Sequence, residues 1–189
     1  MMIDWLLQID WSWLFGDGGF IFAVEILIPA AIQSVTGVSS GFKYAEVVWD
    51  SVLNPGGART EVGVAPFAAF AALPENGIAL NVNGKIYFGT IQIHADGPTF
   101  VNGDVTIIAC KPLTGKVWLG KLGSGYYAGG DPAADTNPTA TLSPGTFHVA
   151  AGIAKDGGTP TGGAQFTIRT ANAQFTGTKP VGSTSWSGV

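Results

Sequence analysis

The side chains of this chain that could do chemistry are concentrated in one glycine-rich stretch. Residues 115–142 read GKVWLGKLGSGYYAGGDPAADTNPTATL and place aromatic rings beside carboxylates and an amide. Aromatic faces stack on the C–H faces of sugars, while carboxylates and amides bond to sugar hydroxyls, so this combination suits a carbohydrate ligand. The six candidate ligand-binding residues are Trp118, Tyr126, Tyr127, Asp131, Asp135 and Asn137. In the alternative interpretation, Trp118 lies in the core and the two tyrosines pack across a subunit contact.

The same stretch could bind calcium, because Asp131, Asp135 and Asn137 supply oxygen donors within seven residues. Their spacing differs from that of an EF-hand, and Pro132 and Pro138 stiffen the run. Asp and Asn side chains also cap turns in glycine-rich loops. We therefore expect turn capping here, and we expect neither a metal site nor a cofactor.

The remaining titratable residues do not predict an enzyme. A retaining glycosidase needs two carboxylates about 5–5.5 Å apart, and no glutamate has a second carboxylate two residues away. Glu46 and Asp50 share strand parity, but four residues separate them by roughly 13 Å along a strand. We expect His148 to be solvent-facing or hydrogen-bonded on the polar side of its strand and His94 to end a strand. No nucleophilic serine and no zinc site are expected.

Composition limits the class of protein. The 189 residues suggest one domain with an appendage. Only 12% of the residues are charged, against about 25% in an average soluble domain. The net charge is −4 and the basic residues are scattered, which argues against a nucleic-acid partner. Cys110 stands alone in the apolar run VTIIAC, where we expect a buried small side chain.

Residues 1–35 form a hydrophobic N-terminal arm in this interpretation. No Lys or Arg occurs before Lys43, so the arm lacks the positive region of a secretory signal. Its longest near-apolar run, residues 20–32, is short of the roughly 20 residues that span a bilayer. On a helix, Met2, Leu6, Ile9 and Trp13 would share a side, whereas IDWSWLF at residues 9–15 alternates like a strand.

The arm is too apolar to lie free in water, since burying each large aromatic stabilises by roughly 1.5–3 kcal/mol. Its surface could be its own sandwich, a neighbouring subunit or a membrane. The acidic residues of the arm disfavour an anionic membrane, so we favour a protein neighbour. The residues expected to dock are Trp5, Leu6, Ile9, Trp11, Trp13, Phe15, Phe20 and Phe22.

Short strands predominate from residue 36 to residue 189. The runs IALNVN (78–83), TFHVAA (146–151) and QFTIRT (165–170) alternate with period two and predict half-buried antiparallel strands. VTIIAC (105–110) and KIYFGTIQI (85–93) are apolar throughout and suit inner strands covered on both sides. Turn signals recur roughly every ten residues, which indicates an all-β antiparallel sandwich or jelly roll.

Several motifs from about Gly41 onward carry a resemblance to a known family. GFKYAEVVWDSV and TEVGVAP look like two of its strands, and GDPAADTNP with GTFHVA looks like its most characteristic loop and strand. On these motifs the chain resembles the SPRY-like, concanavalin-type β-sandwich modules often seen in bacteriophage tail and fibre proteins. Two positions depart from the family pattern: Leu122 stands where Asn is frequent, and Asp135 stands where Gly is frequent.

The resemblance implies a virion structural protein, either a phage tail or fibre component or a capsid-associated display module. Its partners would be other virion proteins and copies of itself, and its outward task would be attachment to host-surface glycans. Two alternatives stay open: a purely structural or decorating protein without a host ligand, and a membrane-active entry protein that inserts its arm into lipid. In each case the expected location is the virion.

Overall fold

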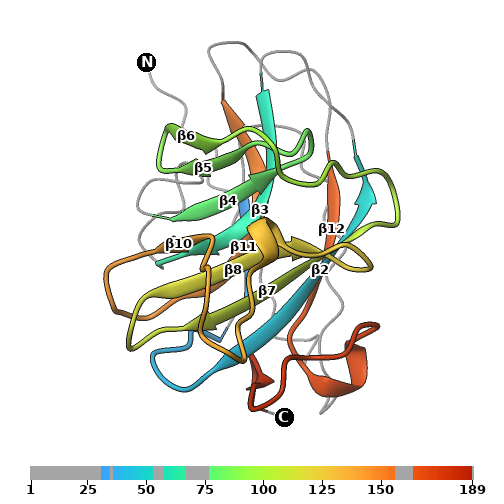
Figure 1. Ribbon diagram of the computed structural model, residues 1–189. Helices are drawn as coiled ribbons and strands as arrows, with labels where there is room; N and C mark the ends of the chain where they lie inside the picture. Colours follow the sequence, from blue (N-terminus) through green and yellow to red (C-terminus); the bar gives the residue numbers. More distant parts are fainter. Residues whose placement is uncertain (1–30, 35, 53–57, 67–76, 156–163, 189) are drawn as a thin grey trace, which may run out of the picture.

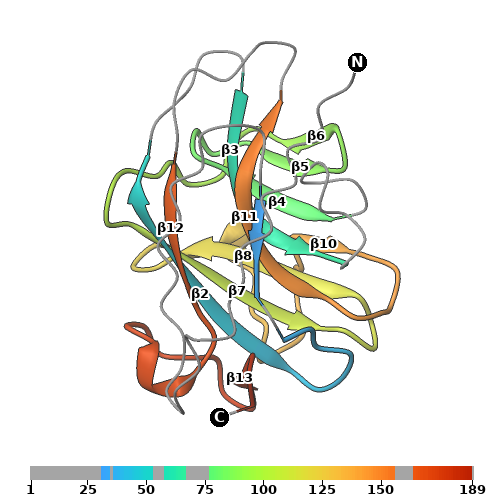
Figure 2. The ribbon, with the colours of Figure 1, turned by 180° about the vertical axis from the view of Figure 1, so that it is seen from behind.

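Two sheets pack face to face in the computed structural model of the chain, which describes residues 31–34, 36–52, 58–66, 77–155 and 164–188 (Figure 1). The first sheet has six strands in the order β1-β11-β3-β4-β5-β6, all paired antiparallel. In that order they are β1 (Ala31–Gln33), β11 (His148–Lys155), β3 (Ala58–Ala65), β4 (Ile78–Asn81), β5 (Ile86–Phe88) and β6 (Ile91–His94). Figure 2 shows this sheet from behind, with β1 beside β11.

The second sheet has seven strands around the central order β10-β8-β7-β2-β12, with β9 paired to β8 and β13 paired to β2. The strands are β10 (Ala140–Thr141), β8 (Lys116–Lys121), β7 (Val105–Lys111), β2 (Lys43–Ser51), β12 (Gln165–Arg169), β9 (Gly125–Tyr126) and β13 (Thr184–Ser185). Among the described residues, the short 3-10 turns η2 (Tyr127–Gly129) and η3 (Asn172–Gln174) lie outside the sheets. The predicted all-β antiparallel sandwich is confirmed.

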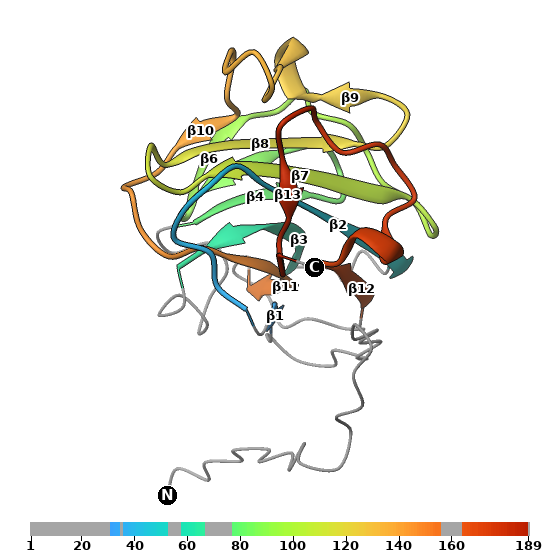
Figure 3. The ribbon, with the colours of Figure 1, turned by 90° about the horizontal axis from the view of Figure 1, so that it is seen from below.

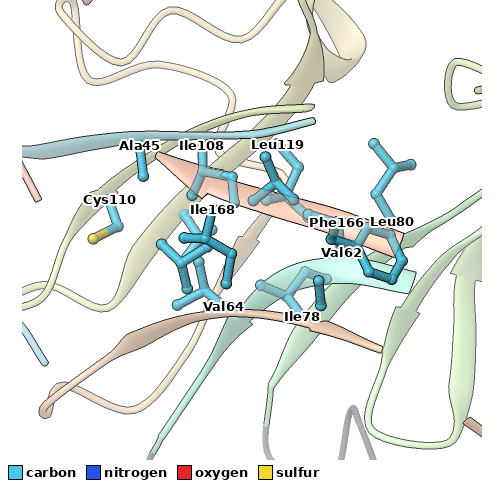
Figure 4. Close-up of a cluster of buried hydrophobic side chains, with 14 of the residues drawn as sticks. Ala45, Val62, Val64, Ile78, Leu80, Ile108, Cys110, Leu119, Phe166 and Ile168 are labelled. Carbon is cyan, nitrogen blue, oxygen red and sulfur yellow. The ribbon is translucent and has the colours of Figure 1, made fainter. Parts of the chain in front are cut away.

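The core lies between the sheets and follows the predicted alternation. Ile78 and Leu80 point inward from β4, and Phe166 and Ile168 point inward from β12 (Figure 4). VTIIAC also behaves as predicted, because β7 is buried along its length between β8 and β2. Cys110 belongs to this core.

One strand prediction is wrong. KIYFGTIQI does not form an inner strand covered on both sides but splits into the hairpin β5–β6. Gly89 takes a left-handed φ of 60°, which allows a tight turn there. Because β6 is the last strand of its sheet, Ile91 remains 66% exposed and Ile93 38% exposed.

The sandwich begins earlier than the predicted division at residue 35. Residues 31–33 form β1 on β11, and the Ser34 amide donates to the Val149 carbonyl at 2.8 Å. The rest of the arm, with all eight predicted docking residues, lies outside the described residues. In the part of the chain that the structure describes, no helix is long and apolar enough to cross a membrane.

Candidate functional site

The predicted site lies on the outer side of the seven-stranded sheet. Val117 and Leu119 of β8 point into the core, so Trp118 and Gly120 point outward. The strand register places five residues in one row across this face. From β9 to β12 the row is Tyr126, Gly120, Ile107, Glu46 and Arg169. Two irregular segments cover the face: the 127–139 loop, which projects beyond β8 in Figure 3, and the C-terminal segment, residues 170–188.

Trp118 lies beneath the 127–139 loop. Its side chain is fully buried, and its indole Nε1 donates a hydrogen bond to the Thr136 carbonyl at 2.8 Å. The ring is on the opposite side of the sheet from the core cluster, so it belongs to a second buried layer. A ring with no exposed face cannot stack on a sugar, and the prediction that Trp118 forms part of a ligand platform is wrong.

Asp135 is held by two lysines that flank the β7–β8 turn. Lys111 Nζ lies 2.7 Å from Oδ1 and Lys116 Nζ lies 2.5 Å from Oδ2. Hydrogen bonds from Lys111 and then Lys116 keep the pKa of Asp135 below its ordinary value. Its φ of 63° lies in the left-handed region, which glycine adopts more readily than aspartate. Both carboxylate oxygens are therefore occupied by protein groups.

Asp131 caps a turn, as predicted for this loop. Its Oδ1 accepts hydrogen bonds from the amides of Ala133 at 2.9 Å and Ala134 at 3.0 Å. Asn137 is exposed and has a φ of 46°. Within the described ranges, no group of three or more His, Cys, Asp and Glu side chains is arranged to hold a metal ion.

The two adjacent tyrosines have different surroundings. Tyr127 donates its hydroxyl to Asp96 Oδ1 at 2.7 Å, and its ring centroid lies 4.7 Å from that of His94. This hydrogen bond raises the pKa of Tyr127 and lowers the pKa of Asp96. Tyr126 lies in the outward-facing row, where burial and then the charge of Glu46 raise its pKa. Both rings are partly exposed, so they are the candidates that retain accessible surface.

A polar network around Glu46 was not predicted. Glu46 is fully buried, and its two oxygens accept hydrogen bonds from groups of β2, β12 and the C-terminal segment. The donors are Tyr44 Oη at 3.0 Å, the Gly177 amide at 2.8 Å, the Thr176 amide and hydroxyl at 2.9 Å each, and Arg169 Nη1 at 3.4 Å. Burial, followed by the Glu46 carboxylate, raises the pKa of Tyr44. The sequence contains one signal of this network, a glutamate inside the apolar strand YAEVVW.

All seven carboxylates in the described part of the chain have protein partners. Glu61 lies 3.6 Å from Arg59, Asp104 lies 2.6 Å from Lys121, and Asp50 accepts a hydrogen bond from Thr167. Glu46, Asp96, Asp131 and Asp135 are bound as described above. None is left as a free acid or base beside a second carboxylate. These side chains hold loops and strands in place.

The His148 side chain and the serines of residues 37–41 also do not form a catalytic arrangement in the described structure. His148 is buried and its Nδ1 lies 2.8 Å from the Ser34 carbonyl oxygen, so the hydrogen-bonded alternative is confirmed over the solvent-facing one. Residues 37–41, GVSSG, match the letters of the G-x-S-x-G nucleophile motif, a match that the sequence interpretation missed. That motif requires a strand-to-helix turn. Here the segment leads directly into β2, and Ser39 and Ser40 are exposed.

Comparison with known proteins supports the fold. No family model matches the sequence, and no curated protein matches it. The SPRY domain of human HERC1 superposes with a TM-score of 0.54 at 16% identity, covering 76% of this chain and 84% of that domain.

Two further structures give lower scores. A second human SPRY domain has a TM-score of 0.46 at 15% identity, over 75% of this chain and 85% of its own. A putative β-glucanase from Mycobacterium abscessus has a TM-score of 0.32 at 14% identity, over 74% and 66%. The HERC1 likeness and the strand order together show that this chain has the SPRY-like, concanavalin-type β-sandwich fold.

Proposed function

We propose that this chain is a structural protein of a viral particle: a non-enzymatic β-sandwich module that joins a phage tail, fibre or capsid surface through its N-terminal arm. The observation that carries the non-enzymatic part is that all seven described carboxylates have protein partners, six through hydrogen bonds and Glu61 through an ion pair with Arg59. The virion part is supported by the loop motif GDPAADTNP and by the scarcity of charge. Other virion proteins and copies of this chain are the proposed partners.

The attachment of the arm supports the same proposal. Thirty residues precede β1, and β1 is an edge strand of the six-stranded sheet. The arm therefore enters the sandwich at the edge of a sheet, where it can extend toward another protein without crossing the core. Its eight large apolar docking residues and its lack of Lys and Arg suit a protein partner better than an anionic membrane.

Deletion of residues 1–30 tests this function, because it removes the arm and keeps β1. The shortened chain is expected to keep its β-type circular dichroism spectrum and to lose incorporation into particles. A matched full-length variant, Val181→Ser, changes one exposed apolar residue of the sandwich and is expected to incorporate normally. Incorporation of the shortened chain at the full-length level would contradict the proposal. Flotation of the intact chain with liposomes would instead favour the membrane-active alternative.

Attachment to host-surface glycans is a second candidate function. It is favoured by the partly exposed rings of Tyr126 and Tyr127, and by the strained positive-φ residues that follow them, Ala128, Asp135 and Asn137. A glycan array with the intact chain tests it. Binding that is reduced by Tyr126→Ala or Tyr127→Ala would support attachment, and an array without signal would leave the purely structural role.

A further inference from the structure

The edge strand β6 lacks the features that usually prevent strand addition. Residues 89–95, GTIQIHA, contain no Lys, Arg, Asp, Glu or Pro. Natural edge strands are commonly protected by charges, prolines or a covering segment. Ile91 and Ile93 are exposed on β6, and Phe88 of the neighbouring strand β5 is 39% exposed. This edge is therefore a suitable acceptor for another strand.

The exposed residues continue the apolar side of the sheet. Ile86 is buried in the core, and Phe88 lies two residues later on the same face of β5. Ile91 is paired with Phe88 in the β5–β6 register, so it shares that face. At Phe88 and Ile91, the core-facing side of this sheet therefore extends beyond the area that the opposite sheet covers. A strand added beside β6 would continue the core if it carried large apolar residues at alternate positions.

The arm contains a segment with that pattern. In IDWSWLF, residues 9–15, the alternate positions are Ile9, Trp11, Trp13 and Phe15. We propose that residues 9–15 of a neighbouring copy of this chain add as a strand beside β6, with this row against Phe88 and Ile91. The main-chain hydrogen bonds of the added strand would provide affinity, and the alternate side chains would provide specificity. The inference rests on the proposed function of the arm and identifies its acceptor surface.

The proposed function favours a neighbouring copy over the same chain, because copies of this chain are among its proposed partners. The arm joins the sheet at β1, and β11, β3, β4 and β5 separate β1 from β6. On that distant edge Ile91 is 66% exposed. From Phe15 to Ala31 an extended chain reaches about 50 Å, which is enough to contact an adjacent molecule. Donor and acceptor surfaces differ, so two copies can exchange arms reciprocally in a dimer, or the contact can continue head-to-tail into a ring or a filament.

Self-association of the full-length chain provides the first test. Ile91→Lys places a charge on the acceptor edge and is expected to raise the dissociation constant for self-association by at least about tenfold. Leu113→Lys, at a site that is 70% exposed on the β7–β8 turn, has the same change of charge and is expected to have no effect. Sedimentation velocity measures both, with circular dichroism to verify folding. Equal association of Ile91→Lys and the unaltered chain would overturn the inference.

Cross-linking identifies the occupant of the edge. A chain with Trp11→Cys or Trp13→Cys is mixed with a chain carrying Ile91→Cys, and the native Cys110 does not compete because it is buried. A disulfide between the mixed chains is expected, and none is expected when the acceptor is Leu113→Cys. A cross-link that forms only within a chain carrying both cysteines would place the arm on its own sandwich and overturn the inference.

The two proposals fail in different ways. If deletion of residues 1–30 prevents particle incorporation while Ile91→Lys changes neither incorporation nor self-association, the arm docks elsewhere. In that case the acceptor surface is wrong and the proposed function of the arm stands. If the deletion also has no effect on incorporation, both proposals are contradicted.

Discussion

The C-terminal segment and the 127–139 loop cover the same face of the seven-stranded sheet, but different kinds of contact hold them there. The C-terminal segment is held by the fully buried carboxylate of Glu46, which accepts hydrogen bonds from Thr176 and Gly177. The 127–139 loop is held by the Trp118 indole and by the partly exposed ion pairs of Asp135 with Lys111 and Lys116.

The difference shows how burial determines how strongly a carboxylate contact stabilises the fold. Ion pairs that water reaches contribute little, because both partners are well solvated when apart. A buried carboxylate with a full set of donors cannot lose its partners without leaving unsatisfied groups in a dry environment. We therefore expect the C-terminal segment to be bound firmly through Glu46, whereas the loop depends on Trp118 and on the backbone beneath it.

The largest effect is expected for Glu46→Ala. Removing the carboxylate leaves the buried Tyr44 hydroxyl and the amide of Gly177 without their acceptor, and should lower the free energy of unfolding by about 3–5 kcal/mol. Urea denaturation measures the loss. Asp50→Ala on the same strand is the control, because Asp50 is exposed and accepts one hydrogen bond from Thr167. Similar losses for the two variants would show that burial is not the deciding factor.

Gly120→Ala should have the next largest effect. A Cβ at this position would overlap the carbonyl oxygen of Gly125 and the Cα of Tyr126, because β9 lies close against β8. We expect a loss of about 1–3 kcal/mol and a less ordered start to the 127–139 loop. Thermal unfolding and limited proteolysis near residue 126 provide the measurements. Gly145→Ala is the control, since its nearest atom is the Ser143 carbonyl oxygen at 3.9 Å.

A smaller effect is expected for Trp118→Phe. The phenyl ring keeps most of the apolar contact, but the Thr136 carbonyl loses its indole donor. Because Thr136 is exposed and water can replace the donor, the expected loss is about 1 kcal/mol. Amide hydrogen exchange should be faster in residues 131–137 and unchanged in residues 172–177. An equal rise in the exchange rate of both segments would mean that the 127–139 loop and the C-terminal segment are not held independently.

Asp135→Asn should have the smallest effect on stability. The effect should be measurable as a difference in the pH dependence of stability at acid pH. The folded state holds the pKa of Asp135 below its ordinary value of 3.8, so its contribution is present above that value and is lost as the pH falls through the folded pKa. The unaltered chain should lose slightly more thermal stability than the variant between about pH 5 and pH 2. Added salt should reduce the difference, because the pairs are screened. A large difference at neutral pH would contradict the comparison.

The sequence was sufficient to predict several strands but not their places in the sheets. Alternation identified the inward residues of β4 and β12, because the side-chain period of a strand is local. The same rule could not show that β6 is an edge, since an apolar run has the same composition at an edge and at a centre. The order of strands depends on pairings between distant residues, such as β11 with β3.

The sequence predicted some of the residues of the candidate site, but it predicted few of the contacts between them. The turn-capping role of Asp131 follows from its own neighbours, and the structure confirms it. The partners of Glu46 and Asp135 lie far away in sequence: Thr176 is 130 residues from Glu46, and Lys111 is 24 residues from Asp135. Spacing along the chain contains no information about such contacts, so both networks had to be found in the folded molecule.

The position of β1 has a mechanical consequence. Any pull on the arm reaches the sandwich through three paired residues at the margin of a sheet, followed by Ser34 on Val149 and by Val38 on Phe147. A pull directed away from β11 breaks these hydrogen-bonded pairs one after another, which requires less force than shearing the whole strand along its axis. Under load, this margin should detach from β11 first and absorb the displacement while the two packed sheets remain folded.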